Sequence, residues 1–314
     1  MTPGRPVRSR LTALTLSGVV AVSACAPTPV AMAPAPLPVV VAPLPETPQS
    51  AAMRAYFVQV QATLLSRGLL RTDNGATDAP YSDRMLAEAF LRIALYDEFQ
   101  PGPGGYVAQE TESILRRWQG PVRVALRFGA SVPEARRATE RARVGSYLAR
   151  LSGITGHPIR LSDSAPNFFV YIVSEDERQS LGPEIAATMP GFQTNEIRAF
   201  TAMPPTTYCQ VSVQSEARSG VYTRALAVIR SEHTNLMHLA CLHEEIAQGL
   251  GLPNDSPRAR PSIFNDDQEF ALLTPMDEAM LRLLYNPALR PGLSLGQARP
   301  IVEALARAMT GGGA

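Results

Sequence analysis

Lysine is absent from this chain of 314 residues, so its 29 basic side chains are all arginine. Charge of either sign is also limited, because 28 acidic residues balance the arginines and leave a formal net charge of +1. This balance gives no indication of a nucleic-acid partner or of a strongly acidic one. The apolar fraction of 45% is enough for one hydrophobic core and a smaller satellite cluster.

Long hydrophobic runs are scarce, and the one at the amino terminus, residues 11–22, is too short to span a bilayer. Three basic residues precede it: Arg5, Arg8 and Arg10. Residues 22–25 (VSAC) follow as a lipoprotein cleavage box, so we predict a lipoprotein signal peptide over residues 1–24. By resemblance to bacterial lipoproteins, Cys25 would carry the lipid; an ordinary secretory peptide with a coincidental cysteine is the alternative. Ala26 then favours the outer membrane as the periplasm-facing anchor in a bacterial cell envelope.

Proline and helical periodicity organise the next segment. Residues 25–50 contain eight prolines among alanine and valine, which predicts an extended tether. Helical spacing over residues 51–70 and 82–99 predicts two helices, and residues 100–105 (QPGPGG) are a breaker. We interpret residues 51–119 as a helical extension packed on the main domain, with an independent helical interaction module as the alternative.

Alternating and continuous apolar patterns predict the elements of the main domain, residues 120–290. In chain order they are a strand at 122–128, a helix at 133–151, strands at 158–161 and 167–173, a helix at 176–187, strands at 209–213 and 222–229, and a helix that carries Glu244. The run at 167–173 (NFFVYIV) is apolar throughout, as expected of a central strand. Residues 291–314 are expected to form a C-terminal tail.

The segment 244–254 reproduces the zinc-protease pattern HExxHxxGxxH but lacks its three histidines. Glu244, Gln248 and Asn254 occupy the three metal-ligand positions. Glu245 remains at the position of the general base, which would deprotonate a metal-bound water. The sequence therefore has the spacing, the glutamate and the glycine of a metallopeptidase site, but it has carboxylate and carboxamide groups in place of the imidazole ligands.

The spacing of this segment has a geometric meaning. Residues four apart share a helix face, and Gly251 in a left-handed conformation would end the helix and return Asn254 to the same point. Carboxamides such as those of Gln248 and Asn254 are weak, hard oxygen donors, whereas catalytic zinc is usually held by imidazole. No cofactor is therefore expected, and a divalent cation is the alternative.

Residues further along extend the likeness. Residues 262–265 lie where metzincin proteases have a turn with a methionine beneath the metal, and Phe264 takes the methionine's place. Residues 273–285 look like the closing helix of those enzymes. Residues 120–287 thus resemble metzincin and matrixin zinc proteases. The resemblance implies an α+β zincin fold with a mixed twisted sheet, a long active-site-type helix and a C-terminal helix.

The wider chain is similar to a proteobacterial family of lipoproteins of unknown function. The segments that carry this second resemblance are Tyr208-Cys209-Gln210, Cys241-Leu242-His243-Glu244-Glu245 and Leu252-Pro253-Asn254-Asp255. An exported, oxidising setting favours a disulfide between Cys209 and Cys241, which would tie a strand to the helix that carries Glu244. The alternative is a thiolate metal ligand, because Cys241, Glu244 and Gln248 are spaced to share a helix face.

Other polar residues near the motif have simpler explanations. His243 projects about 100 degrees away from the face shared by Glu244 and Gln248, so it is not expected to replace a ligand. His238, near the helix start, is expected to be hydrogen-bonded or at the surface. Several acids could form an oxygen-rich cation site, although solvation explains them equally: Glu244, Glu245, Asp255, Asp266 and Asp267.

Two functions are consistent with these features. In the first, the chain is an envelope lipoprotein with a degenerate, non-catalytic metallopeptidase-like domain that binds an envelope protein or peptide. In the second, it is a divergent metal-dependent hydrolase in which Glu245 acts as the general base.

Overall fold

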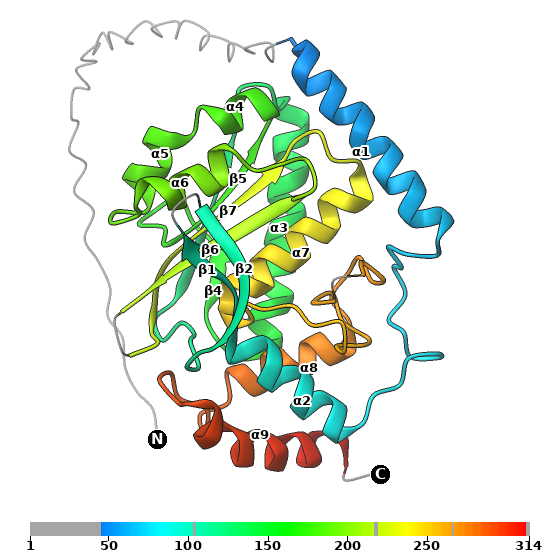
Figure 1. The fold of residues 1–314 in the computed structure, drawn as a ribbon, viewed down its shortest axis with the longest axis vertical. Coiled ribbons are helices and arrows are strands. Elements are labelled where there is room, and N and C mark those ends of the chain that lie inside the picture. Colours follow the sequence, from blue (N-terminus) through cyan, green and yellow to red (C-terminus); the bar gives the residue numbers. More distant parts are fainter. Residues whose placement is uncertain (1–44, 103–104, 217–218, 266, 312–314) are drawn as a thin grey trace, which may run out of the picture. The chain divides into compact units, whose positions relative to one another are not determined.

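A five-stranded sheet forms the centre of the main domain (Figure 1). In spatial order its strands are β4 (Ile159–Leu161), β3 (Val122–Phe128), β5 (Phe168–Val173), β7 (Tyr222–Arg230) and β6 (Cys209–Ser215). β6 runs antiparallel to β7, and the other neighbours are parallel. All six residues of β5 are buried, which confirms the predicted central strand. The predicted order of the strands from β3 onward and the α+β class are confirmed.

The computed structural model describes residues 45–102, 105–216, 219–265 and 267–311. All of these residues belong to one unit, residues 42–314. The predicted signal peptide, Cys25 and most of the predicted tether lie outside the described residues. None of the helices in the described part of the chain is both long and apolar enough to cross a membrane.

Helices cover both faces of the sheet. α3 (Glu134–Thr155) and α7 (Asn235–Gly251) contribute to the larger core, while α5 (Gly182–Thr188) and α6 (Thr194–Thr201) contribute to a smaller one. Strand β5 divides its side chains between these cores by simple alternation: Phe168, Val170 and Ile172 join the larger, and Phe169, Tyr171 and Val173 the smaller. This two-sided burial explains why β5 is apolar throughout.

The segment between β5 and β6 contains more helices than the sequence predicted. In place of one helix over residues 176–187, the chain forms α4 (Glu175–Gln179) and α5, followed by α6. The break falls at Ser180 and Leu181, just before Gly182 and Pro183 in the first turn of α5. A proline in that position starts a helix readily but cannot continue the hydrogen bonding of a preceding one.

The amino-terminal elements also differ from the prediction. α1 (Pro48–Ser66) begins inside the expected tether, because Thr47 caps it and Pro48 occupies its first turn. α2 (Asp83–Ala94) starts at the predicted cap, Ser82, but ends before residue 99. The chain then enters an antiparallel hairpin of β1 (Tyr96–Gly102) and β2 (Gly105–Glu112). Residues 100–102 and 105 of the predicted breaker lie in these strands, and residues 103–104 lie outside the described residues.

The expected C-terminal tail is instead largely helical. α9 (Leu295–Thr310) begins with a capping box formed by Ser294 and Gln297, and it packs against α2. α8 (Pro275–Leu284) is the predicted closing helix and contacts α2, α3 and α9. Buried residues of α2, α8 and α9 belong to the larger core, whereas Phe57 of α1 belongs to a separate small cluster.

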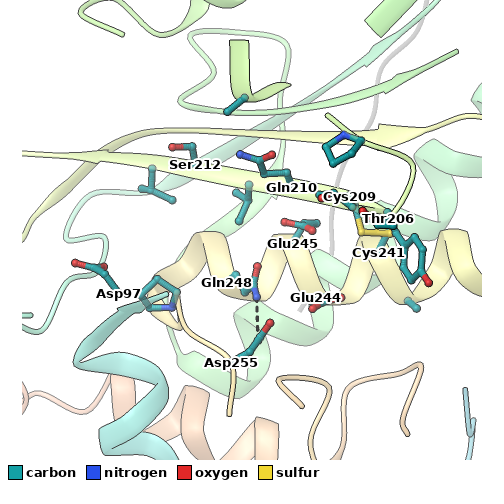
Figure 2. A pocket seen from close by; sticks show the side chains of 18 of the residues that line it. Asp97, Thr206, Cys209, Gln210, Ser212, Cys241, Glu244, Glu245, Gln248 and Asp255 are labelled. Atoms are coloured by element: carbon teal, nitrogen blue, oxygen red, sulfur yellow. Dashed lines mark hydrogen bonds between the residues drawn. A yellow bond between two sulfur atoms is a disulfide. The ribbon is translucent and has the colours of Figure 1, made fainter. Parts of the chain in front are cut away.

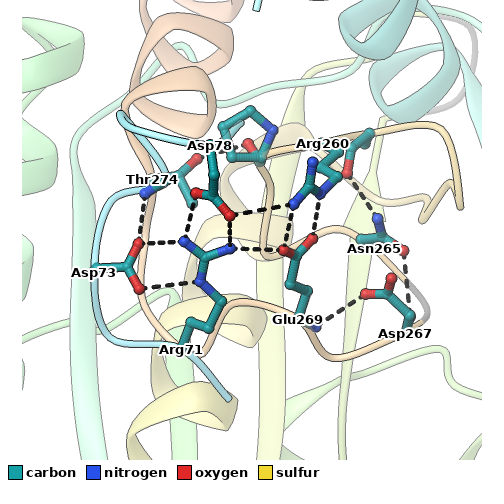
Figure 3. Close-up of polar contacts among 11 residues, drawn as sticks. Arg71, Asp73, Asp78, Arg260, Asn265, Asp267, Glu269 and Thr274 are labelled. Atoms are coloured by element: carbon teal, nitrogen blue, oxygen red, sulfur yellow. Dashed lines mark hydrogen bonds and ion pairs between the residues drawn. The ribbon is translucent and has the colours of Figure 1, made fainter. Parts of the chain in front are cut away.

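A network of charged side chains joins the α1–α2 connection to the loop between α7 and α8 (Figure 3). Arg71 pairs with Asp73 and Asp78 at 2.7 Å and with Glu269 at 2.9 Å. Glu269 also pairs with Arg260 at 2.6 Å. Arg71 holds the pKa of the exposed Asp73 carboxyl at about 2. The network fixes the loop that follows the α7 motif.

Candidate functional site

A cavity of about 1320 Å³, here called the central cavity, lies along strand β6. All seven residues of β6 line it, and α7 contributes the facing wall (Figure 2). The chain that leads from α6 into β6, including Thr206 and Tyr208, lines it as well. The motif helix and the edge strand therefore enclose one space.

Two glycines allow α7 to approach its neighbours closely. A Cβ at Gly249 would come within 2.5 Å of the ring of Phe168 on β5. Gly251 has a φ of 131°, and a Cβ there would lie 2.4 Å from the carbonyl oxygen of Arg116. Trp118 is fully buried and donates a hydrogen bond from its indole nitrogen to the carbonyl of Gly249 at 2.9 Å. Gly251, the glycine of the motif, is thus required both by its positive φ and by the close approach of the Arg116 carbonyl, and the pattern predicted a glycine conformation at this position.

The motif side chains Glu244, Glu245 and Gln248 line the central cavity together with Asp255. Glu245 is 4% exposed and Gln248 is 8% exposed, whereas Glu244 is partly exposed. The Gln248 side-chain amide donates a hydrogen bond to the Asp255 carboxylate at 3.2 Å (Figure 2). The carboxamide at the second ligand position is therefore engaged with an acid of the next loop.

The third ligand position does not join this group. Asn254 is 1% exposed, and its amide donates to the carbonyl of Arg92 at 3.0 Å and to Glu110 of β2 at 3.1 Å. The expected convergence of Glu244, Gln248 and Asn254 is corrected accordingly: Asp255 lines the cavity in place of Asn254. A buried amide needs hydrogen-bond partners, and the end of α2 and the hairpin provide them for Asn254.

The predicted disulfide between Cys209 and Cys241 is present, with a Cα–Cα distance of 5.9 Å. It joins the first residue of β6 to α7 across one end of the central cavity. The sulfur of Cys209 and the carboxylate oxygens of Glu244 and Glu245 lie within 4.8 Å of one another. Because this sulfur is already bonded, the donors left for a cation are oxygens, which suit magnesium, calcium or manganese better than zinc.

Asp277 positions the turn that follows the motif. This fully buried carboxylate accepts hydrogen bonds from the Ser262 hydroxyl at 2.5 Å, from the Ile263 amide at 3.1 Å and from the Thr274 amide at 2.8 Å. Burial raises its pKa to about 6, against the lowering effect of these bonds. Phe264, at the position of the metzincin methionine, is fully buried in the larger core.

The two histidines of α7 lie outside the central cavity, as predicted for His243, and His238 is buried rather than at the surface. His243 stacks on Tyr147 with ring centroids 4.1 Å apart, and its Nδ1 accepts the Leu273 amide at 3.1 Å. Burial lowers the pKa of His243 to about 4. His238 is 1% exposed and lies 3.0 Å from the carboxylate of Glu140.

Several lining residues were not predicted from the sequence. Gln210, Ser212 and Gln214 are the polar members of the β6 alternation, so the alternation itself was the signal that could have identified them. Asp97 of β1 and Arg116 also line the cavity and form an ion pair. No local pattern indicates that pair, because it depends on the hairpin. Asp267 lines the cavity, whereas Asp266 lies outside the described residues.

Comparisons with known proteins give one match. A family model described as "Protein of unknown function (DUF2927)" matches residues 83–304, from the start of α2 into α9. No curated protein and no solved structure matches the chain. The matched span includes the motif, the disulfide and every residue of the central cavity that lies on β6 or α7.

Proposed function

We propose that this chain, which belongs to the DUF2927 family, is a lipid-anchored envelope protein whose central cavity binds an extended peptide segment without cleaving it. The domain would be a metzincin-like pseudo-peptidase. The observation that carries this proposal is the cavity along the whole length of β6, with α7 as its opposite wall.

The open edge of β6 supports an extended ligand. β6 is the last strand of the sheet and pairs with β7 alone among the strands that the structure describes. A strand at the edge of a sheet can take an added strand on its outer side. Seven residues at ~3.4 Å per residue give a binding length of about 24 Å, which suits a segment of about seven residues.

The charge of the lining favours basic side chains in the ligand. Six carboxylates and three arginines line the central cavity. Arg116 and Asp97 form an ion pair with each other, so the other lining residues include five carboxylates and two arginines. Glu244 and Glu245 lie on the wall that faces β6, where a guanidinium or ammonium group of a bound peptide could reach them.

The donor set at the motif supports binding rather than zinc-dependent cleavage. Zinc hydrolases hold the metal with imidazole and carboxylate groups and keep one position open for water. Here Gln248 donates its amide to Asp255, and Asn254 is directed toward Arg92 and Glu110. Glu245, at the general-base position of the motif, lines the cavity. A divergent hydrolase is therefore the second candidate function.

Binding can be measured by fluorescence anisotropy with a labelled heptapeptide of alternating arginine and alanine. We expect saturable binding that weakens about tenfold or more in Glu244→Gln, because a charge-assisted contact is removed. Glu134→Gln is the matched control, since Glu134 is an exposed acid at the start of α3. N-methylation of every second peptide nitrogen should abolish binding in one register and spare it in the other. Equal binding of both N-methylated peptides would contradict strand addition.

The same peptide separates the two functions. A pseudo-peptidase leaves it intact during long incubation with added magnesium, manganese, calcium or zinc, as judged by mass spectrometry. Cleavage that is reduced ~10²- to 10⁴-fold in Glu245→Gln, with unchanged stability, would instead establish the hydrolase with Glu245 as general base.

The lipid anchor has its own test. Cys25→Ser is expected to release the protein from membranes or to leave an uncleaved precursor, because we propose that the lipid on Cys25 is the anchor. Fractionation of cells that express each form, followed by mass analysis of the amino terminus, measures this. Membrane association that remains lipid-dependent in Cys25→Ser would exclude the anchor.

A further inference from the structure

A second cavity, of about 410 Å³, lies where the first turns of α3 and α7 meet. Its lining residues include Arg136, Glu140, Arg143, His233, Asn235 and His238. None of these residues lines the central cavity. We call this space the α3–α7 cavity.

His233 is the residue that points to a ligand. It is 4% exposed, and neither nitrogen of its ring has a hydrogen-bond partner among the described residues. The ring packs edge-on against Phe57 of α1, with centroids 4.4 Å apart, and also lines the α3–α7 cavity. Buried polar atoms are normally paired, so an imidazole with two unpaired nitrogens beside a cavity indicates a partner in that cavity.

The charges around the cavity are predominantly positive. Arg136 and Arg143 lie on the α3 side, and the single lining carboxylate, Glu140, is 3.6 Å from the first and 3.5 Å from the second. Glu140 also lies 3.0 Å from the ring of His238, so two guanidinium groups and an imidazole surround this carboxylate. Burial lowers the pKa of His233 well below its ordinary value, and His238, Arg230 and Arg136 lower it further. The electrostatic potential at the imidazole is therefore positive, and a bound anion would be attracted to it.

The α7 helix adds a partial positive charge to the same place. α7 has 17 residues, and Asn235 and His238 in its first turn line the α3–α7 cavity. Its N-cap residue, Thr234, makes no side-chain cap hydrogen bond to the helix. Gln61 of α1 accepts the Met237 amide at 3.3 Å. The end of a helix of this length attracts anions through its amide groups and its dipole.

We propose that the α3–α7 cavity binds a phosphate-class oxyanion, held by Arg136 and Arg143, by the imidazole of His233 and by the first turn of α7. A phosphate group carries nearly two negative charges at neutral pH, which matches two guanidinium groups, whereas a carboxylate would match one. Two arginines in the lining oppose a metal cation. Glu232, the other acid nearby, is turned to Ser50 and to the amide of Glu175, at 2.6 and 2.7 Å.

Isothermal titration of the full chain with inorganic phosphate tests the site, with chloride adjusted to keep the ionic strength constant. We expect saturable binding that is at least about tenfold weaker in His233→Phe and in Arg143→Gln, since each removes a hydrogen bond to a charged group. His233→Phe keeps a flat ring against Phe57. Arg141→Gln is the matched control, because Arg141 lies on the same helix, pairs with Asp163 at 3.7 Å and does not line the cavity.

The outcomes separate this inference from the peptide proposal. Absence of phosphate binding, or equal weakening in Arg141→Gln and Arg143→Gln, would overturn the site. Should His233→Phe fail to fold, the comparison of Arg143 with Arg141 still decides, because both side chains are partly exposed. Loss of peptide binding leaves phosphate binding unchanged, since the two cavities share no residue.

The source of the phosphate group is decided by competition. Vesicles of phosphatidic acid, whose headgroup is a phosphomonoester, would identify a lipid headgroup as the ligand if they displace bound inorganic phosphate. Failure to displace it, with phosphate binding intact, would identify a free anion. Both results keep the oxyanion site. Phosphatidylcholine vesicles serve as the zwitterionic control.

Discussion

Arg230→Met is expected to lower the free energy of unfolding by about 3–5 kcal/mol, because it leaves buried polar groups without their partner. Arg230 is fully buried at the end of β7 and forms an ion pair with Glu175. The Nη1 of Arg230 bonds to Glu175, and its Nη2 donates to the carbonyls of Met203 and Pro204 at 2.8 and 2.9 Å. Arg178 also pairs with Glu175, at 2.6 Å, but does not reach those carbonyls.

Equilibrium unfolding in urea measures this loss. Arg160→Met on β4 is the matched control, because Arg160 is exposed and its removal should change stability by less than about 0.5 kcal/mol. A loss of under about 1 kcal/mol in Arg230→Met would show that the buried network does not hold this part of the fold. Pro204 lines the central cavity, and Arg230 holds its carbonyl in place. Peptide binding should therefore weaken together with stability in Arg230→Met.

Cys209→Ala combined with Cys241→Ala is expected to cost about 3 to 4 kcal/mol of stability. The bond closes a loop with a sequence separation of 32, and the chain-entropy model assigns about this value to a loop of that size. Because the bond joins β6 to α7, its removal should also widen the distribution of cavity shapes and weaken binding of the extended peptide. Urea unfolding and the anisotropy assay measure the two effects.

Reduction provides the internal control for this pair. Dithiothreitol should lower the unfolding midpoint of the wild-type chain toward that of the double variant and should leave the double variant unchanged. A wild-type midpoint that is insensitive to reduction, with the thiols shown to be free by mass spectrometry, would contradict a stabilising role. The close packing of Gly249 on Phe168 and of Gly251 on Arg116 does not involve the disulfide. It should therefore not make up for the stability that is lost when the disulfide is removed.

The sequence predicted part of the geometry of the motif. Spacing placed Glu244 and Gln248 on one helix face, and both line the cavity. Gly251 was predicted to end the helix, and its positive φ agrees. The return of Asn254 was not predicted correctly, because the direction of a side chain after the turn depends on competing partners. Arg92 and Glu110, more than 140 residues away along the chain, supply them.

Local patterns failed where structure depends on distant pairing. The β1–β2 hairpin was missed because neither strand has the alternation of apolar and polar residues that marks β3, and pairing of the two strands provides the stabilisation. The same hairpin supplies Asp97 to the central cavity. α9 did carry a local signal, the capping box of Ser294 and Gln297, and the expected tail overlooked it.

By itself, the sequence determined the order of the strands in the main domain, the central position of β5 and the pairing of Cys209 with Cys241. These features follow from periodicity and from the small number of cysteines, which act locally or leave a single choice. Only the tertiary structure decided that Asp255 replaces Asn254 in the central cavity and that His233 is buried beside two arginines. Burial and hydrogen-bond competition depend on every element that packs around a residue, and no stretch of sequence contains that information.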